Sequence, residues 1–136
     1  MNHDRRQLLN SARLAPPKFR YTPCVKSGGI GFVSGMVALD PATGTLVEGS
    51  MGAQTQRIFD NLRLALPDYG FTLHELCAAR VYTTRFDRFA EFNEVWERQF
   101  EHIAPPARTA LGVAALPLGA LVEIEFTFHQ APDPRP

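Results

Sequence analysis

The sequence has little of several features that would point directly to a class of function. Basic and acidic residues are equal at 14 each, so the formal net charge is zero and the positive excess typical of a nucleic-acid-binding domain is missing. No apolar run approaches the roughly 18 residues of a membrane span. Leu8-Leu9 is too short for the apolar part of a signal peptide. We therefore expect a cytoplasmic protein that binds neither nucleic acid nor a membrane.

Potential metal ligands and reactive thiols are also scarce. The two cysteines, Cys24 and Cys77, are far apart in the sequence, and we expect both to be free thiols in a reducing compartment. Because Cys77 falls in a strand pattern, it is predicted to be buried rather than nucleophilic. The four histidines show no ligand spacing. The sequence therefore predicts no metal site and no cofactor.

What the chain does have is enough apolar sequence for one domain. Its 136 residues are 45% hydrophobic, which suits a single globular core. Residues 1–18 are polar and end at Pro16-Pro17, which predicts a flexible N-terminal arm before a domain at 19–131. The proline-rich residues 132–136 are predicted to be a frayed tail.

Hydrophobic periodicity predicts an α+β domain with the order β-β-α-β-α-β-β. The predicted strands cover residues 19–25, 31–39, 76–84, 108–116 and 121–128, and the predicted helices cover 54–66 and 89–103. We expect a mixed sheet with both helices packed on one face, because two helices can cover only one face. The strands are nevertheless apolar on both alternating sets. The uncovered face is therefore expected to bind other copies, with clefts between subunits.

One arginine stands at the start of an otherwise apolar predicted strand. Arg108 is followed by a strand that carries Glu123 and Glu125 on one face. A guanidinium group is permanently charged and, in a sheltered place, needs an anionic partner. That partner could be Glu123, Glu125 or a bound acid. The residues taken alone favour a structural ion pair with one of the glutamates.

Short motifs along the chain resemble those of the RidA (YjgF) enamine/imine deaminases. They are Tyr21, Ser34-Gly35, Asp60-Asn61, Phe89-Ala90-Glu91-Phe92-Asn93, Pro106-Ala107-Arg108-Thr109, Leu116-Pro117 and Glu123-Ile124-Glu125. The resemblance implies a chorismate-mutase-like fold and a homotrimeric barrel with three sites between subunits. It also implies cofactor-free hydrolysis of imines such as 2-iminopropanoate, the tautomer of 2-aminoacrylate, to a 2-keto acid and ammonia.

The same resemblance implies roles for individual residues. Arg108 would hold the carboxylate of a small-molecule substrate, and Glu123 would act on the attacking water or the leaving nitrogen. Tyr21 and Ser34 would line the pocket from a neighbouring subunit. Ala110 would contribute through its backbone.

The chain departs from the family pattern at a few positions. Ala110 replaces a cysteine, Leu118 replaces a lysine, Phe19-Arg20 replaces Gly-Pro before the tyrosine, and Met36 replaces a common glutamine. These changes indicate a less polar pocket and a bulkier or different substrate. One alternative is therefore a deaminase or binding protein for a larger, aminomuconate-like acid. Others are a non-catalytic ligand-binding or chaperone-like protein, and a ribonuclease or translation inhibitor, which the balanced charge disfavours.

Overall fold

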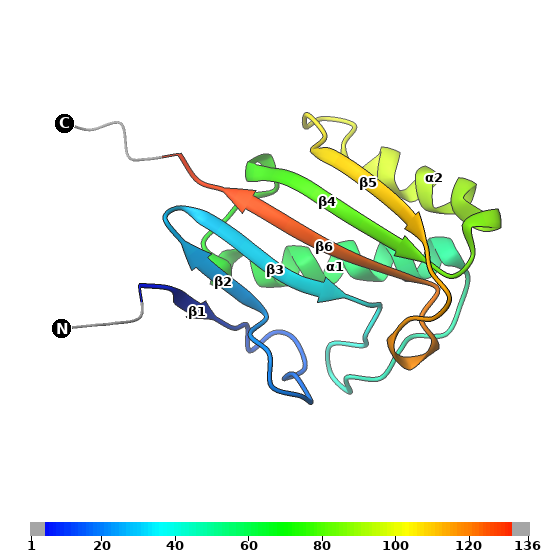
Figure 1. The fold of residues 1–136 in the computed structure, drawn as a ribbon, viewed down its shortest axis with the longest axis horizontal. Helices are drawn as coiled ribbons and strands as arrows, with labels where there is room; N and C mark the ends of the chain where they lie inside the picture. Colours follow the sequence, from blue (N-terminus) through cyan, green and yellow to red (C-terminus); the bar gives the residue numbers. More distant parts are fainter. Residues whose placement is uncertain (1–4, 132–136) are drawn as a thin grey trace.

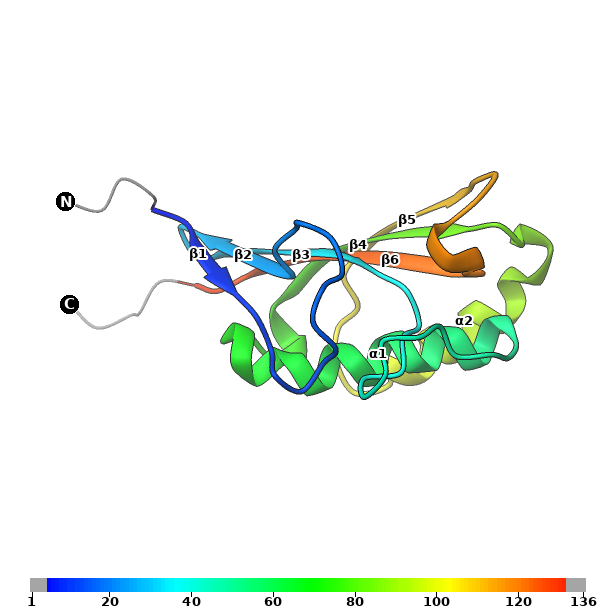
Figure 2. The same ribbon diagram turned by 90° about the horizontal axis from the view of Figure 1, so that it is seen from below.

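The computed structural model describes residues 5–131, which form a layer of β-sheet backed by a layer of two helices (Figures 1 and 2). The strands are β1 (Gln7–Leu9), β2 (Cys24–Ser27), β3 (Ile30–Met36), β4 (Leu76–Thr83), β5 (Ala107–Gly112) and β6 (Val122–His129). The helices are α1 (Met51–Tyr69) and α2 (Phe89–Gln99). The six-stranded sheet has the order β1-β2-β3-β6-β4-β5, and β4 and β5 pair in parallel while the other pairs are antiparallel. The predicted mixed α+β architecture is confirmed.

The core lies between the helices and one face of the central strand β6. Alternate residues of β6 are buried there, while the intervening ones are only half-buried. The buried set is Val122, Ile124, Phe126 and Phe128. Helix α1 supplies Ile58 and Leu62 from the predicted stripe, and α2 supplies Phe92 and Trp96. The two periodicities, two in the strand and about 3.6 in the helices, therefore converge on one apolar layer.

Helix α1 is one turn longer at its N-terminal end than the sequence predicted, because it is capped outside the apolar stripe. The Ser50 hydroxyl accepts a hydrogen bond from the Ala53 backbone N–H at 3.2 Å. At the other end Gly70 takes the left-handed conformation, with φ 78°, and its N–H reaches the Leu66 carbonyl at 2.9 Å. The predicted end of this helical region at Gly70 is confirmed.

The N-terminal segment differs from the predicted flexible arm over residues 1–18. Residues Gln7–Leu9 form edge strand β1, in which Leu9 lies opposite Cys24. The Ser11 hydroxyl then donates to Asp68 Oδ2 at 2.6 Å, which ties the segment to the end of α1. A three-residue edge strand has too short an alternation to be recognised in a sequence. Residues 1–4 and the predicted tail at 132–136 lie outside the described residues.

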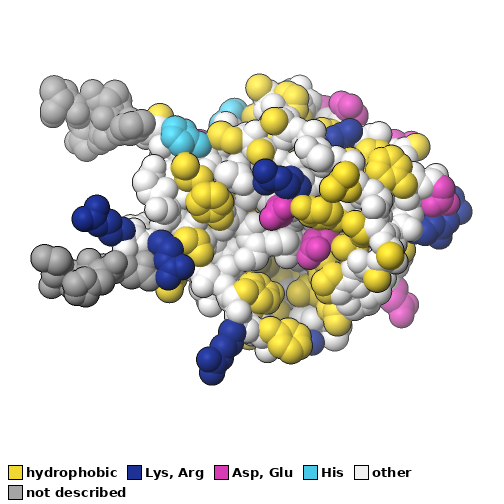
Figure 3. All heavy atoms as spheres, viewed as in Figure 1, with side chains coloured by type: hydrophobic (Ala, Val, Ile, Leu, Met, Phe, Trp, Pro, Cys, Tyr) yellow, Lys and Arg dark blue, Asp and Glu magenta, His cyan; other side chains and the backbone are white. Residues whose placement is uncertain are grey.

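The helices leave the other sheet face uncovered, as the sequence predicted (Figure 2). Half-buried Glu123 and Glu125 of β6 lie on this open face, together with Phe32 of β3 and Leu111 of β5, which are each 50% exposed. Figure 3 shows that apolar side chains are spread over this face with a few charged groups among them. Exposed apolar surface of this kind marks interaction sites. None of the helices within residues 5–131 is long and apolar enough to cross a membrane.

Both cysteines are free thiols, as predicted, but their environments differ. Cys24 is buried in the core, and burial raises the pKa of its thiol to about 11. Cys77 is exposed, so the prediction that it is buried is wrong. The pairing of β4 with β6 is irregular between Leu76 and Ala78, and this irregularity breaks the alternation on which the prediction rested.

Candidate functional site

Arg108 projects from edge strand β5 toward the helix side of the sheet. It lies opposite Ala79, whose side chain is buried in the core, so the two side chains share that face. Its Nη1 donates to Asn93 Oδ1 at 2.9 Å. The guanidinium carbon is 5.0 Å from the ring centroid of Trp96 and 5.4 Å from that of Phe89. Arg108 is therefore held by aromatic faces and one amide.

Neither glutamate pairs with this arginine, so the structural ion pair that the residues alone favoured is wrong. Arg108 is exposed and forms no ion pair with Glu123 or Glu125. A guanidinium group has five N–H donors, and Asn93 occupies one of them. The remaining donors stay accessible to a planar anion. Of the three predicted partners, a bound acid is the one compatible with this geometry.

Asn93 is a functional residue that the sequence reasoning did not single out. It stands four residues after Phe89 and three before Trp96, so the three share one face of α2. Phe86, Phe89 and Phe92 stack in succession along this face, with centroid separations of 4.7 and 4.8 Å. The aromatic stripe predicted as core therefore has a second role. Its outer end forms a surface on which the guanidinium lies.

Glu123 occupies a different region, on the open face of β6. A Cβ atom added to Gly35 would lie 2.8 Å from Glu123 Oε2, so the absence of a side chain there lets the carboxylate pack against β3. The pairing of β3 with β6 is irregular between Val33 and Met36, which brings Gly35 to this position. Burial, and secondly the negative charge of Glu125, raise the pKa of Glu123.

Glu125 already has a partner on the same face. The Tyr82 hydroxyl donates to Glu125 Oε1 at 2.8 Å, and this hydrogen bond raises the pKa of Tyr82. Glu123 has no corresponding donor within residues 5–131. The two carboxylates are therefore distinct, and Glu123 is the one left free to exchange a proton with a ligand.

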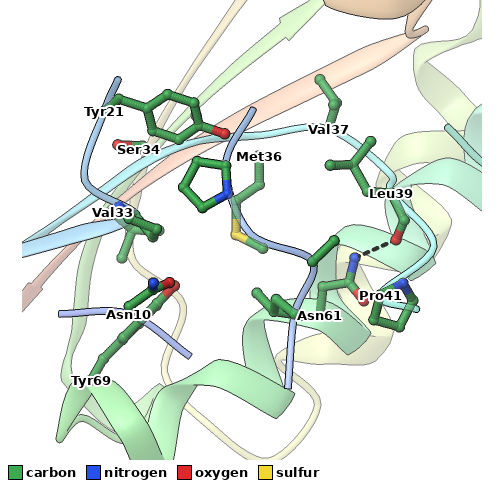
Figure 4. Close-up of a pocket in the computed structure, with 15 residues that line it drawn as sticks. Asn10, Tyr21, Val33, Ser34, Met36, Val37, Leu39, Pro41, Asn61 and Tyr69 are labelled. Carbon is green, nitrogen blue, oxygen red and sulfur yellow. Dashed lines mark hydrogen bonds between the residues drawn. The ribbon is translucent and has the colours of Figure 1, made fainter. Parts of the chain in front are cut away.

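Tyr21 and Ser34 lie near Glu123, on the β3 side of the sheet. Ser34 donates its hydroxyl to the Thr22 carbonyl at 2.7 Å and its backbone N–H to the Pro23 carbonyl at 2.9 Å, so it anchors the loop that carries Tyr21. The Tyr21 ring lies beside Ser34 (Figure 4) and is 52% exposed. Both residues line one cavity together with Gly35. Three predicted site residues, Tyr21, Ser34 and Glu123, are thus brought to one region.

Ala110 belongs to the Arg108 region instead. It lies opposite buried Val81 and packs against the core, so its side chain offers no polar group. Strand β5 is at the edge of the sheet, so alternate backbone groups along it have no partner strand and can meet a ligand. Of the other departures, Met36 lines the cavity beside Ser34. Leu118 is 60% exposed in a turn, with a left-handed φ of 60°.

The two regions cannot serve one small molecule within a single chain. Strand β4 lies between β5 and β6, which separates Arg108 from Glu123 laterally by two strand spacings, or roughly 10 Å. The two side chains also leave opposite faces of the sheet. Each chain therefore presents half of a site at each of two places.

Gly35 gives a direct test of this geometry. We expect Gly35→Ala to push the Glu123 carboxylate aside and to lower turnover about 10- to 100-fold, because displacement of a reacting group by 1 Å can cost this much. The fold should persist, since Gly35 does not need a positive φ. Activity and melting temperature are compared with Gly52→Ala, where an added Cβ would have no neighbour nearer than 3.7 Å. An unchanged rate in Gly35→Ala would show that the position of Glu123 is immaterial.

Comparison with known proteins agrees with the fold and the motifs. Residues 12–130 match a family model described as endoribonuclease L-PSP. A RutC family protein from Aquifex aeolicus is 38% identical over 119 residues, covering 87% of this chain and 94% of the relative. Protein DfrA from Myxococcus xanthus is 40% identical over 101 residues, covering 74% and 76%.

Solved structures show the same architecture over nearly the whole chain. A conserved Rid family protein from Yersinia pestis, YyfA, superposes with a TM-score of 0.88 at 27% identity, covering 92% of this chain and 99% of that one. RidA from an Antarctic Psychrobacter superposes with a TM-score of 0.85 at 32% identity, covering 91% and 99%. The chain belongs to the RidA/YjgF family, as the resemblance of its motifs predicted.

Proposed function

We propose that this protein hydrolyses reactive enamine/imine intermediates of the 2-aminoacrylate/2-iminopropanoate class to a 2-keto acid and ammonia. The observation that carries the proposal is an exposed Arg108 with no carboxylate partner, held in place by Asn93 and aromatic rings. Such a group is suited to the carboxylate of a 2-imino acid. The half-buried Glu123, with its raised pKa, is suited to exchange protons at the imine carbon and nitrogen.

A complete site then requires a second copy of the chain. Arg108 and Ala110 come from one subunit, and Glu123, Tyr21 and Ser34 come from its neighbour. The open sheet face supplies apolar surface for association, including Leu8, Ile30, Phe32 and Leu111. This contact joins two different surfaces, so it must close into a ring to give a finite assembly. Three copies make the homotrimeric barrel that the resemblance implies, with three intersubunit sites.

The reaction in this site needs positioning and modest proton transfer. Arg108 binds the substrate carboxylate through two N–H donors. A water oxygen bonds to the protonated imine carbon as the π pair of the C=N bond moves to nitrogen, and Glu123 accepts a proton from that water. Glu123 then returns the proton to nitrogen. The C–N bond breaks, the hydroxyl proton passes to the carboxylate, and ammonia and the 2-keto acid leave.

The test generates 2-aminoacrylate from serine with a dehydratase and follows keto-acid release. Release faster than the spontaneous rate, in proportion to added protein, supports the proposal. Release at the spontaneous rate contradicts it, and tight binding of a carboxylate without turnover identifies a ligand-binding protein instead. RNA cleavage that Arg108→Ala leaves unchanged would assign the family's ribonuclease description to this chain.

A further inference from the structure

A cavity of about 100 Å³ lies along β3, next to Glu123 but on the helix side of the sheet (Figure 4). Its walls are β3, helix α1 and the chain between β1 and β2. The lining is mainly apolar and includes Leu14, Val33, Met36, Val37, Leu39 and Pro41. It arises because β2 reaches only as far as Val33, so the rest of β3 is covered by loop rather than by a strand.

The cavity is preformed by polar contacts within its own wall. The Ser34 hydroxyl is bonded to the Thr22 carbonyl, which fixes the loop to β3. Asn61 donates to the Leu39 carbonyl at 2.7 Å, which ties α1 to the chain after β3 (Figure 4). The Asn61 carbonyl also accepts from Arg57 Nε at 3.0 Å. These groups hold the walls apart and have little capacity left for an occupant.

Tyr69 differs from those wall residues. It is 2% exposed and lines the cavity, yet its hydroxyl has no hydrogen-bond partner within residues 5–131. No fully buried polar side-chain atom in that part of the chain lacks a partner, so this hydroxyl is open to the cavity. Burial raises the pKa of Tyr69 to about 12, so it remains a donor at neutral pH. A lone donor in an apolar wall indicates an occupant with an acceptor.

The cavity is also continuous with the Glu123 region. Gly35 lines it, and the same residue lies against the Glu123 carboxylate. Tyr21 stands at the exposed end of the lining. A molecule whose reacting carbon is beside Glu123 can therefore extend its tail past Tyr21 toward Tyr69.

We infer that this cavity binds the side chain of the substrate and selects 2-imino acids with an unbranched, mainly apolar side chain of about four or five heavy atoms ending near an acceptor. This inference rests on the proposed function. The size follows from the volume, because a 150 Å³ apolar cavity accommodates benzene and this one is smaller. A methyl side chain, as in 2-iminopropanoate, would leave the cavity empty.

The test uses 2-oxo acids, the stable products, as probes of binding by calorimetry. Burial of three further methylene groups should make 2-oxohexanoate bind roughly 10- to 60-fold more tightly than pyruvate. Met36→Phe, which fills the cavity, should remove this preference without weakening pyruvate, whereas the volume-matched Met36→Leu should keep it. Tyr69→Phe should weaken 2,5-dioxohexanoate about 3- to 10-fold and leave 2-oxohexanoate unchanged.

The possible outcomes separate this inference from the proposed function. Equal affinity of the wild-type protein for pyruvate and 2-oxohexanoate overturns the cavity assignment, even if imines are hydrolysed. A length preference that Met36→Phe removes supports it, even if no imine is hydrolysed, a result that would instead overturn the proposed function. If Met36→Phe does not fold, Tyr69→Phe decides. Equal effects on 2,5-dioxohexanoate and 2-oxohexanoate then overturn the inference.

Discussion

Arg108→Ala is expected to lower kcat/KM for 2-iminopropanoate by about 100- to 1,000-fold. The substitution removes two charge-assisted hydrogen bonds to the substrate carboxylate, each worth about 1.5–3 kcal/mol in a sheltered site. Because Arg108 is exposed and forms no ion pair with either glutamate, its removal should leave no buried charge unpaired and the fold should persist. Keto-acid release from imine generated in situ measures the effect, and size-exclusion chromatography shows whether the assembly remains.

Two further variants make this result specific. Arg108→Lys keeps the charge but loses the planar pair of donors, so an intermediate loss of about 10-fold or more is expected. Arg98→Ala removes another exposed arginine of the α2 region and should leave turnover at the wild-type rate. If Arg98→Ala and Arg108→Ala lowered the rate equally, the effect would be one of surface charge and the carboxylate-binding role would be wrong.

Glu123→Gln is expected to lower kcat by about 100- to 10,000-fold, the usual contribution of a positioned general base. Glutamine has nearly the same shape, so binding of pyruvate should change little and the loss should fall on turnover. The matched control is Glu125→Gln, which changes the neighbouring carboxylate that already accepts from Tyr82. If Glu125→Gln removed turnover and Glu123→Gln did not, the assignment of the base would be reversed.

The pH dependence follows from the same group. The reaction needs ionised Glu123, so the rate should fall as pH decreases through the pKa of this carboxyl. Burial and Glu125 raise that pKa, so the acidic limb should lie above the ordinary glutamate value of about 4.3. Glu123→Gln should abolish this limb. A wild-type limb at or below the ordinary value would mean that another group controls the rate.

The sequence predicted the fold well because its periodic signals are long. Strand β6 alternates buried and half-buried residues over its whole length, and Ile58 and Leu62 repeat at helical spacing in α1. The same alternation predicted correctly that one sheet face is left uncovered. Short or irregular elements could not be predicted this way. Strand β1 has three residues, and the displaced Cys77 depends on an irregularity that no local pattern reveals.

The residues of the site were predicted better than their arrangement. Alternation correctly put Arg108 and Ala110 on one face of their strand and Glu123 and Glu125 on one face of theirs. It could not show that these are opposite faces of the sheet, because that depends on how β5 pairs with β4. Nor could it show Asn93 as the partner of Arg108, which depends on how α2 packs across the edge strand.

The central claim is that one chain supplies the arginine and another the glutamate, and mixing two inactive variants tests it most directly. Arg108→Ala and Glu123→Gln subunits are unfolded together in equal amounts and refolded into mixed assemblies. Roughly one quarter of the intersubunit sites should then contain both native side chains, so about a quarter of wild-type turnover should return. Mixed assemblies that form but remain as inactive as either parent would contradict a site shared between subunits.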